Sequence, residues 1–157
     1  MHYCRTLREW IRRYGSGRLV YIDESGFEAV QTCLYAWAER GKKVYGERTG
    51  KRGKCENLVT ARRKGKKDLI VPMIFSSCLN ADGFEGGFEC YLLPSLSEPS
   101  VLIMDNAPIH RQSKIKALAE AVSQTVLFLP KYSPDLNDIE HDFSALKQAR
   151  MYAESGT

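Results

Sequence analysis

Short apolar runs, separated by polar and glycine-containing stretches, recur along the chain and have the length expected of buried or half-buried strands. We predict five strands, at residues 18–23, 56–62, 68–75, 101–104 and 125–129. Ser25 and Gly26 predict a sharp turn after the first strand, and residues 35–38 predict a short extended piece. The basic sequence at 64–67 separates two strands at a spacing that favours an antiparallel hairpin.

Apolar residues at helical spacing predict four helices, at residues 3–14, 80–93, 113–122 and 137 to about 153. We expect the first to pack on the core through one face, which consists of Tyr3, Leu7, Trp10, Ile11 and Tyr14. In the second, glycines that each cost roughly 1 kcal/mol predict a weak helix that ends near Pro94. The third ends its apolar face at Val122. The buried stripe of the last consists of Leu136, Ile139, Phe143 and Leu146.

The order of these elements is three strands, then helix, strand, helix, strand and helix. Because the second and third strands form a hairpin and the later ones alternate with helices, the pattern predicts an α/β protein with a central mixed sheet flanked by helices. This is also the order of the ribonuclease H-like fold. A chain of 157 residues suits one such domain, preceded by a helix at residues 1–17 that we interpret as a linker.

Composition removes several classes of function. No apolar run approaches the ~20 residues that a bilayer span requires, and the N-terminus lacks the apolar core of a signal peptide. We therefore expect a cytoplasmic protein with no membrane partner. The five cysteines stand far apart and the chain has only three histidines, so the spacing argues against a zinc site.

Positive charge is concentrated in one segment. Residues 40–67 hold twelve Lys and Arg against two Glu, whereas the rest of the chain is net acidic. Such a segment is typical of a surface that binds a polyanion, although a solvated loop would have the same composition. The candidate DNA-binding residues are Lys42, Lys43, Arg48, Lys51, Arg52, Lys54, Arg62, Arg63, Lys64, Lys66 and Lys67.

Three carboxylates are candidates for metal-dependent chemistry. Asp23 and Asp105 each end an apolar strand, and Glu140 follows Asp105 after 34 intervening residues, on the last helix. Oxygen-only ligation favours Mg²⁺ or Mn²⁺, and two such ions can activate water and stabilise the leaving oxygen in phosphodiester cleavage. Simpler roles stay open: strand-end turn formation for the aspartates, and a helix capping box of Asn137 and Glu140.

Three sequence blocks resemble a known family. They are Tyr-Ile-Asp-Glu-Ser-Gly-Phe at 21–27, Met-Asp-Asn-Ala-Pro-Ile-His at 104–110, and the stretch from Leu129 to His141. Together they are similar to the signature blocks of DDE transposases of the mariner-like superfamily, in its bacterial insertion-sequence branch. The resemblance implies a ribonuclease H-like catalytic domain over residues 18–157 that uses two divalent metal ions, Mg²⁺ or Mn²⁺.

The family's catalytic, metal-binding triad maps onto Asp23, Asp105 and Glu140, and Asn106 and His110 match positions with a supporting role. The implied activity is cut-and-paste transposition, in which DNA strand cleavage is followed by strand transfer. Taken from the residues alone, His110 is more often a loop histidine whose hydrogen bonds are satisfied than a base. The implied partners are double-stranded DNA, as element ends and as a target at TA dinucleotides, and a second copy of the chain.

Two features depart from the family pattern. Asp138 stands where the family usually has proline, which adds a negative charge beside Glu140. The helix-turn-helix region that the family carries before its catalytic domain is absent from these residues, so we expect an upstream DNA-binding half to be a partner. Two alternatives remain: a ribonuclease H-like nuclease without strand transfer, and an inactive DNA-binding remnant of a transposase.

Overall fold

The computed structural model describes residues 2–28, 39–43, 55–76, 79–131 and 133–154. These residues form one mixed sheet in the order β3-β2-β1-β4-β5. The strands are β1 (Leu19–Glu28), β2 (Cys55–Arg63), β3 (Leu69–Phe75), β4 (Val101–Met104) and β5 (Thr125–Phe128). β1, β2 and β3 pair antiparallel, whereas β4 runs parallel to both β1 and β5. The predicted hairpin and the mixed sheet are therefore confirmed.

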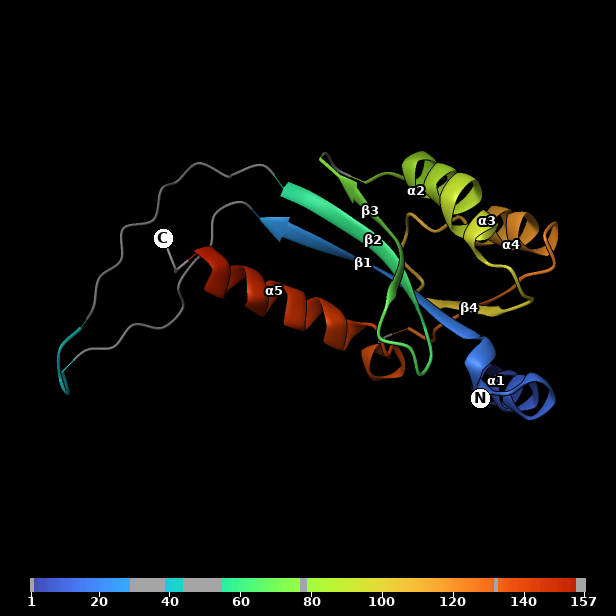
Figure 1. Cartoon of the computed structure of the whole chain (residues 1–157), viewed down its shortest axis with the longest axis horizontal. Coiled ribbons are helices and arrows are strands. Elements are labelled where there is room, and N and C mark those ends of the chain that lie inside the picture. Colours follow the sequence, from blue (N-terminus) through green and yellow to red (C-terminus); the bar gives the residue numbers. More distant parts are fainter. Residues whose placement is uncertain (1, 29–38, 44–54, 77–78, 132, 155–157) are drawn as a thin grey trace.

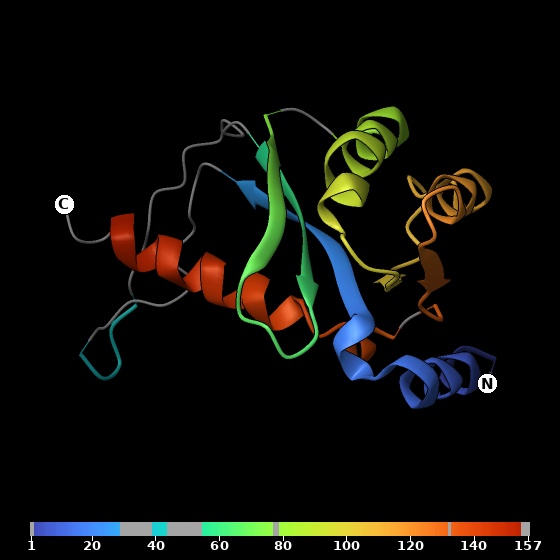
Figure 2. The same ribbon diagram turned by 45° about the vertical axis from the view of Figure 1, so that its right-hand side comes forward.

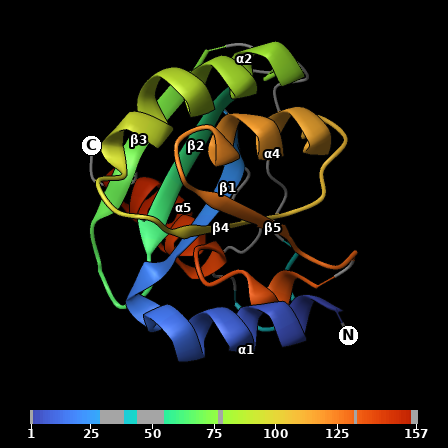
Figure 3. The same cartoon turned by 90° about the vertical axis from the view of Figure 1, so that its right-hand side faces the viewer.

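Helices cover both faces of the sheet (Figure 1 and Figure 3). α1 (His2–Tyr14) and α5 (Glu140–Glu154) lie on one face, here called the α1/α5 face. The other, the α2/α4 face, carries α2 (Ala81–Gly87), a π-helical turn (Phe88–Leu92), α3 (Leu93–Ser95) and α4 (Gln112–Glu120). Short 3-10 turns at Ser16–Arg18 and Pro134–Leu136 complete the order. No helix among the described residues is both long and apolar enough to cross a membrane.

Side-chain alternation along the central strand divides the core in two. Leu19 and Tyr21 pack on the α1/α5 face with Ile139, whereas Val20 and Ile22 pack on the α2/α4 face with the helices there. All four of these β1 side chains are buried. Because β1 is buried on both faces, its first residues form a continuous apolar run in the sequence. The same alternation determines which face of the sheet each residue after Ile22 points to.

The first strand is longer than the sequence predicts. Ser25 and Gly26 do not turn the chain: they stay in β1, paired with Leu58 and Asn57 of β2. The antiparallel ladder continues to the end of β1 at Glu28, and this long-range pairing overrides the local preference for a turn. The extended piece predicted at residues 35–38 lies outside the described residues.

The helix predicted at residues 80–93 forms with an interruption. It starts after Asn80, whose side chain accepts a hydrogen bond from the Gly83 N–H, and it widens into a π-helical turn before Pro94. Pro94 then lies inside the final turn rather than beyond it. Proline has no N–H and its ring crowds the preceding turn, so a local π-helical turn accommodates it without ending the helix.

Some predicted apolar faces are only partly buried. α1 packs on the core as expected, but Tyr14 at its end is 48% exposed. Val122 follows α4 rather than belonging to it and is also 48% exposed, because the helix ends at Glu120. In the last predicted stripe, Ile139 and Phe143 are buried, whereas Leu136 and Leu146 remain exposed large side chains.

Candidate active site

The site lies where β1 extends beyond the end of β4, the parallel strand beside it. β4 pairs with β1 only as far as Tyr21 and Ile103, and β4 ends at Met104, whereas β1 continues to Glu28. Beyond this point the edge of β1 has no strand beside it on the β4 side among the described residues. Such a gap at the carboxyl end of a parallel strand is where ligands bind in open α/β sheets.

Asp23 points from β1 toward the α1/α5 face, as its odd position in the alternation requires. Its Oδ1 accepts a hydrogen bond of 2.8 Å from the Glu24 N–H. Burial raises the pKa of Asp23 against the effect of that hydrogen bond, and the negative charges of Asp105, Glu140 and Glu24 add to the rise, so that the pKa is about 7. The carboxyl group therefore lies in a desolvated, negatively charged environment that favours a proton or a cation.

Asp105 follows β4 directly, and His110 holds its carboxylate. Its Oδ1 lies 3.0 Å from His110 Nδ1 and accepts a longer hydrogen bond, of 3.4 Å, from the Ala107 N–H. The hydrogen bond from His110 holds the pKa of Asp105 below its usual range, against the effect of partial burial. The side chain remains 48% exposed, so one side of the carboxylate stays open to solvent.

His110 is almost completely enclosed, with 1% of its side chain exposed, and its ring packs against Phe84 at 4.4 Å between centroids. Its Nε2 lies 2.6 Å from Glu24 Oε1 on the α2/α4 face. Burial alone would lower the pKa of His110, but the carboxylates of Asp105 and Glu24 outweigh it and raise the pKa to about 9. The predicted supporting histidine is thus a buried ring between two carboxylates, whose negative charges favour its protonated form.

Glu140 begins α5 rather than lying inside it, because the helix starts three residues later than predicted. The alternative role of Asn137 and Glu140 as a capping box is not seen: the Glu140 N–H donates to the Asn137 backbone carbonyl at 3.2 Å, and the buried Asn137 Oδ1 has no hydrogen-bond partner among the described residues. Glu140 itself is exposed at the pocket. The carboxylate is therefore available for a ligand.

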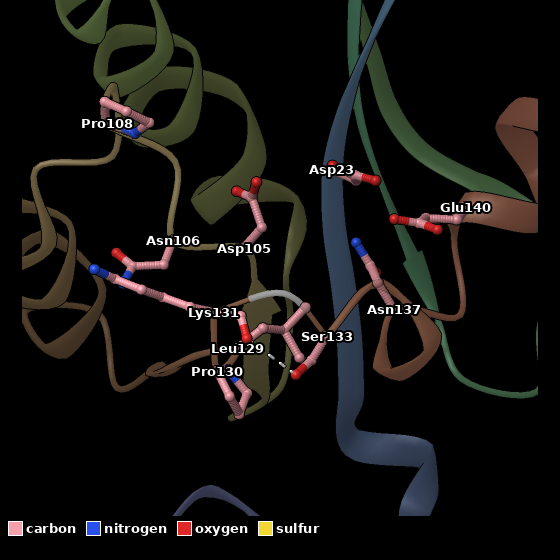
Figure 4. A pocket seen from close by; sticks show the side chains of 10 residues that line it. All are labelled: Asp23, Asp105, Asn106, Pro108, Leu129, Pro130, Lys131, Ser133, Asn137 and Glu140. Atoms are coloured by element: carbon pink, nitrogen blue, oxygen red, sulfur yellow. Dashed lines mark hydrogen bonds between the residues drawn. The ribbon is translucent and has the colours of Figure 1, made fainter.

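The side chains of Asp23, Asp105 and Glu140 all line one open pocket of about 450 Å³. Its lining residues are Asp23, Asp105, Asn106, Pro108, Leu129, Pro130, Lys131, Ser133, Asn137 and Glu140. Figure 4 shows the carboxylates of Asp23 and Glu140 pointing toward one another on one side of β1, with Asn137 beneath them. Asp105 lies on the other side of the strand and its carboxylate points away from that pair. The described residues that group most tightly as metal-capable donors are instead Glu24, Asp105 and His110.

The other predicted site residues fall into three groups. Asn106 lines the pocket, and its side-chain oxygen accepts a hydrogen bond from Gln112. Lys42 and Lys43, and Lys64, Lys66 and Lys67 at the β2–β3 hairpin tip, are exposed. The predicted DNA-binding residues Arg48, Lys51, Arg52 and Lys54 lie outside the described residues.

Arg62 and Arg63, which the sequence predicts as phosphate contacts, are engaged within the protein. Arg62 Nε lies 2.8 Å from Asp142 Oδ2, and its guanidinium also donates to the Asp138 carbonyl at 2.7 Å. Arg63 donates to the Gly17 carbonyl and to the Ser100 hydroxyl. These interactions fasten α5 and the start of β1 to the hairpin, so both arginines have a structural explanation.

Sequence reasoning missed Glu24. The residue lies next to Asp23 but points to the opposite face, where it meets His110. Period-two alternation could have assigned it to the face of Val20 and Ile22, and an acidic residue at such a position needs a partner. The partner itself, 86 residues away in the chain, could not be found from spacing.

The comparisons with known proteins agree with this architecture. The family model described as DDE superfamily endonuclease matches residues 18–156. The structure resembles the Mos1 transposase paired-end complex with left transposon end (TM-score 0.74, 21% identity), covering 94% of this chain and 46% of that one. It also resembles the Mos1 strand transfer complex, with a TM-score of 0.75 and 22% identity, covering 94% of this chain and 46% of that one. The Mos1 mariner paired-end complex with Mn matches with a TM-score of 0.75 and 21% identity, covering 94% of this chain and 47% of that one.

The chain thus spans about half the length of these solved transposases, and at this level of identity the likeness establishes the fold. The ribonuclease H-like fold predicted from the order of elements is confirmed. A search of curated proteins finds no match. Because the family model covers nearly all of the chain, including all three signature blocks, the protein belongs to the DDE superfamily endonucleases.

Proposed function

We propose that this protein is the catalytic domain of a cut-and-paste transposase, which cleaves DNA strands and joins the freed end to a target. The observation that carries the proposal is the shared pocket of Asp23, Asp105 and Glu140, three carboxylates delivered by β1, β4 and α5. Membership of an endonuclease family supports phosphodiester cleavage. The likeness to a Mos1 strand transfer complex supports the joining step.

Two divalent cations, Mg²⁺ or Mn²⁺, would be held by Asp23, Asp105 and Glu140. Mos1 transposase has been solved with each of these metals. The residues present fit such ions: the donors are oxygens, and the carboxyl group of Asp23 is desolvated among like charges. When bound, a pair of cations activates the attacking oxygen and stabilises the leaving one.

The protein's own side chains would orient the donors and the substrate. Asp23 and Asp105 each use Oδ1 for hydrogen bonds within the protein, which fixes their carboxylate planes. Glu140 stands at the first turn of α5, held near the sheet by the buried Ile139 and Phe143. Lys131, exposed on the pocket wall, carries the positive charge suited to a backbone phosphate.

The partner we propose is duplex DNA, both as element end and as a target at TA, bound by a homodimer. An upstream DNA-binding half would supply recognition of the ends. The basic hairpin tip is separate from the pocket, since Lys64 follows Thr60, the partner of Asp23, by four residues. That offset is about 13 Å along the strand at ~3.3 Å per residue. The tip would therefore bind DNA beyond the cleavage point.

The test is nicking of supercoiled plasmid with and without Mg²⁺ or Mn²⁺, comparing wild type with Glu140→Gln. We expect metal-dependent nicking that Glu140→Gln reduces by at least a hundredfold while far-UV circular dichroism is unchanged. Asp135→Asn, an exposed carboxylate in the turn before α5, serves as the matched control and should nick normally. Retained nicking by Glu140→Gln would exclude its proposed role.

A second assay separates transposition from simple nuclease activity. A precut duplex with a free 3′-hydroxyl is incubated with plasmid, and joined products are sought on a gel. We expect joined products that depend on metal and on Glu140. Nicking without joining, even when an upstream DNA-binding half is supplied, would instead support a nuclease that lacks strand transfer.

A further inference from the structure

We propose that Glu24 is a positioning residue that orients both aspartates of the site, Asp23 through its backbone and Asp105 through His110. The inference rests on the proposed function, because it concerns how the carboxylates of that site are held. It assigns a role to a residue on the opposite face of the sheet from Asp23. Three observations on the described residues carry it: one backbone hydrogen bond, one ion pair and one buried ring.

The first of these observations is a backbone hydrogen bond: the Glu24 N–H donates to Asp23 Oδ1 at 2.8 Å. Glu24 is paired with Val59 in the centre of the β1–β2 ladder, so its backbone is fixed by the sheet. This hydrogen bond occupies one oxygen of Asp23. The second oxygen is then oriented by the plane of the carboxylate, toward the side on which Glu140 lies (Figure 4).

The side chain of Glu24 reaches Asp105 through the buried ring of His110. Glu24 Oε1 lies 2.6 Å from His110 Nε2, and His110 Nδ1 lies 3.0 Å from Asp105 Oδ1. With 1% of its side chain exposed and Phe84 against its ring, His110 has little freedom to choose another orientation. A carboxylate oxygen lies against each ring nitrogen, and Nδ1 is also 3.1 Å from the Asp105 backbone carbonyl, so a charged ring with a proton on each nitrogen fits this arrangement. Glu24 thereby sets where His110 holds Asp105.

The two carboxylate oxygens of Asp105 therefore have different roles: one contacts the protein and the other stays open. The contacts that this carboxylate makes with His110 and with the Ala107 N–H both fall on Oδ1. Oδ2 accepts no hydrogen bond from the described residues, and it belongs to a side chain that is 48% exposed. The geometry leaves Oδ2 as the oxygen that would bind a cation. Partners of this kind commonly orient metal ligands.

A different interpretation is that Glu24, Asp105 and His110 themselves hold a metal ion, since their donor atoms lie within 4.8 Å of one another. Metal ligation requires a bare ring nitrogen, whereas each nitrogen of His110 already lies against a carboxylate oxygen. The ring also separates the two carboxylates instead of sharing a centre with them. The geometry therefore favours positioning over ligation by this group.

The test compares wild type with Glu24→Gln, which keeps the size of the side chain and removes its charge. Two quantities are measured: the Mn²⁺ dissociation constant by calorimetry, and the Mn²⁺ dependence of plasmid nicking. We expect the dissociation constant and the half-activating concentration to rise about tenfold or more, the usual effect of losing a residue that orients a ligand. Nicking at saturating Mn²⁺ should stay within about threefold of wild type, which separates positioning from direct participation.

Glu56→Gln is the matched control, because Glu56 is an exposed acidic residue on the neighbouring strand, paired opposite Phe27. A double-mutant cycle with His110→Gln adds a second criterion. If Glu24 acts through His110, then Glu24→Gln should change Mn²⁺ affinity by less than about twofold in the His110→Gln background. Full additivity of the two substitutions would overturn the proposal, as would wild-type Mn²⁺ affinity in Glu24→Gln.

An NMR measurement keeps the inference testable apart from activity. The ring N–H protons of His110 should appear as two downfield resonances in wild type, since the ring is enclosed, and Glu24→Gln should shift or remove the Nε2–H resonance. If wild type neither binds Mn²⁺ nor nicks DNA, the proposed function fails while this resonance still reports the ion pair. If wild type is active and the resonance is unaffected by Glu24→Gln, the positioning role fails alone.

Discussion

Replacing Asp23 with asparagine should stabilise the metal-free protein at alkaline pH. Burial and the charges of Asp105, Glu140 and Glu24 raise the pKa of Asp23 from 3.8 to about 7. A carboxyl group with a raised folded-state pKa contributes stability that is fully present below pH ~4 and is lost as pH rises through ~7. At pH 8 the ionised side chain therefore opposes folding. Asparagine removes that charge and keeps an oxygen for the Glu24 N–H.

The size of the effect follows from the shift. About three pKa units at ~1.4 kcal/mol each give an upper limit of about 4 kcal/mol. The pocket is open to solvent, and screening should leave less than half of this, about 1–2 kcal/mol. For a domain of this size, each kcal/mol moves the Tm by roughly 2–4 °C. Asp23→Asn should thus melt several degrees above wild type at pH 8 in EDTA, and at the same temperature as wild type near pH 4.

The assay is thermal unfolding followed by circular dichroism between pH 4 and pH 8. It stops at pH 8 because the pKa of His110 is about 9, and its loss of charge would add a second transition. Added Mn²⁺ should reverse the order, since a cation that binds the folded wild type stabilises it by mass action. Asp135→Asn controls for a general loss of negative charge. An Asp23→Asn protein that is less stable than wild type at pH 8 in EDTA would refute the reasoning.

Three further outcomes are expected. Replacing Lys64, Lys66 and Lys67 with Gln should make DNA binding less dependent on salt: the slope of log affinity against log salt should fall by about 0.9 for each phosphate that is no longer neutralised. The slope is measured by fluorescence anisotropy on duplex DNA. An unchanged slope would mean that the hairpin tip faces only solvent. Lys114→Met removes the ammonium group that lies 2.5 Å from the buried Glu85 of α2. Urea unfolding should report a decrease in the free energy of unfolding of about 1–2 kcal/mol, a range that already allows for the solvent exposure of the lysine. Phe143→Ala should cost about 3–5 kcal/mol by the same measurement, because this side chain of α5 is buried against the sheet. A cost below about 1 kcal/mol would mean that α5 is not anchored there.

The elements that local pattern determines were predictable, and those that depend on distant pairing were not. Apolar runs located β4 and the start of β1, and an aspartate follows each run because burial on both faces leaves a clear boundary between apolar and polar residues. The length of β1 depends on its ladder with β2, which no local feature at Gly26 reveals. The start of α5 was misplaced because Asn137 resembles a helix cap, although its side chain faces the pocket instead.

The candidate site follows the same division. The three carboxylates were identified from strand ends and from block spacing, and they line one pocket. Charge alone could not separate Arg62, which ties α5 to the sheet, from the exposed lysines of the β2–β3 hairpin tip. The backbone of this hairpin is the green loop in Figure 2. Nor could it find Glu24, whose partner is brought close only by the fold. Composition indicates that a segment is basic, whereas three-dimensional packing decides which of its side chains remain available.

The position of Glu140 at the first turn of α5 has a consequence for how the protein is made. The last strand ends at Phe128, so the residues of the whole sheet, with Asp23 and Asp105, are synthesised before the helix that begins at Glu140. A chain emerging from the ribosome, N-terminus first, would therefore carry two of the three carboxylates and remain without the third. Whatever activity the completed pocket has, a nascent or prematurely ended chain should lack it. Synthesis itself would therefore delay the appearance of a DNA-cutting site until nearly the whole domain has been translated.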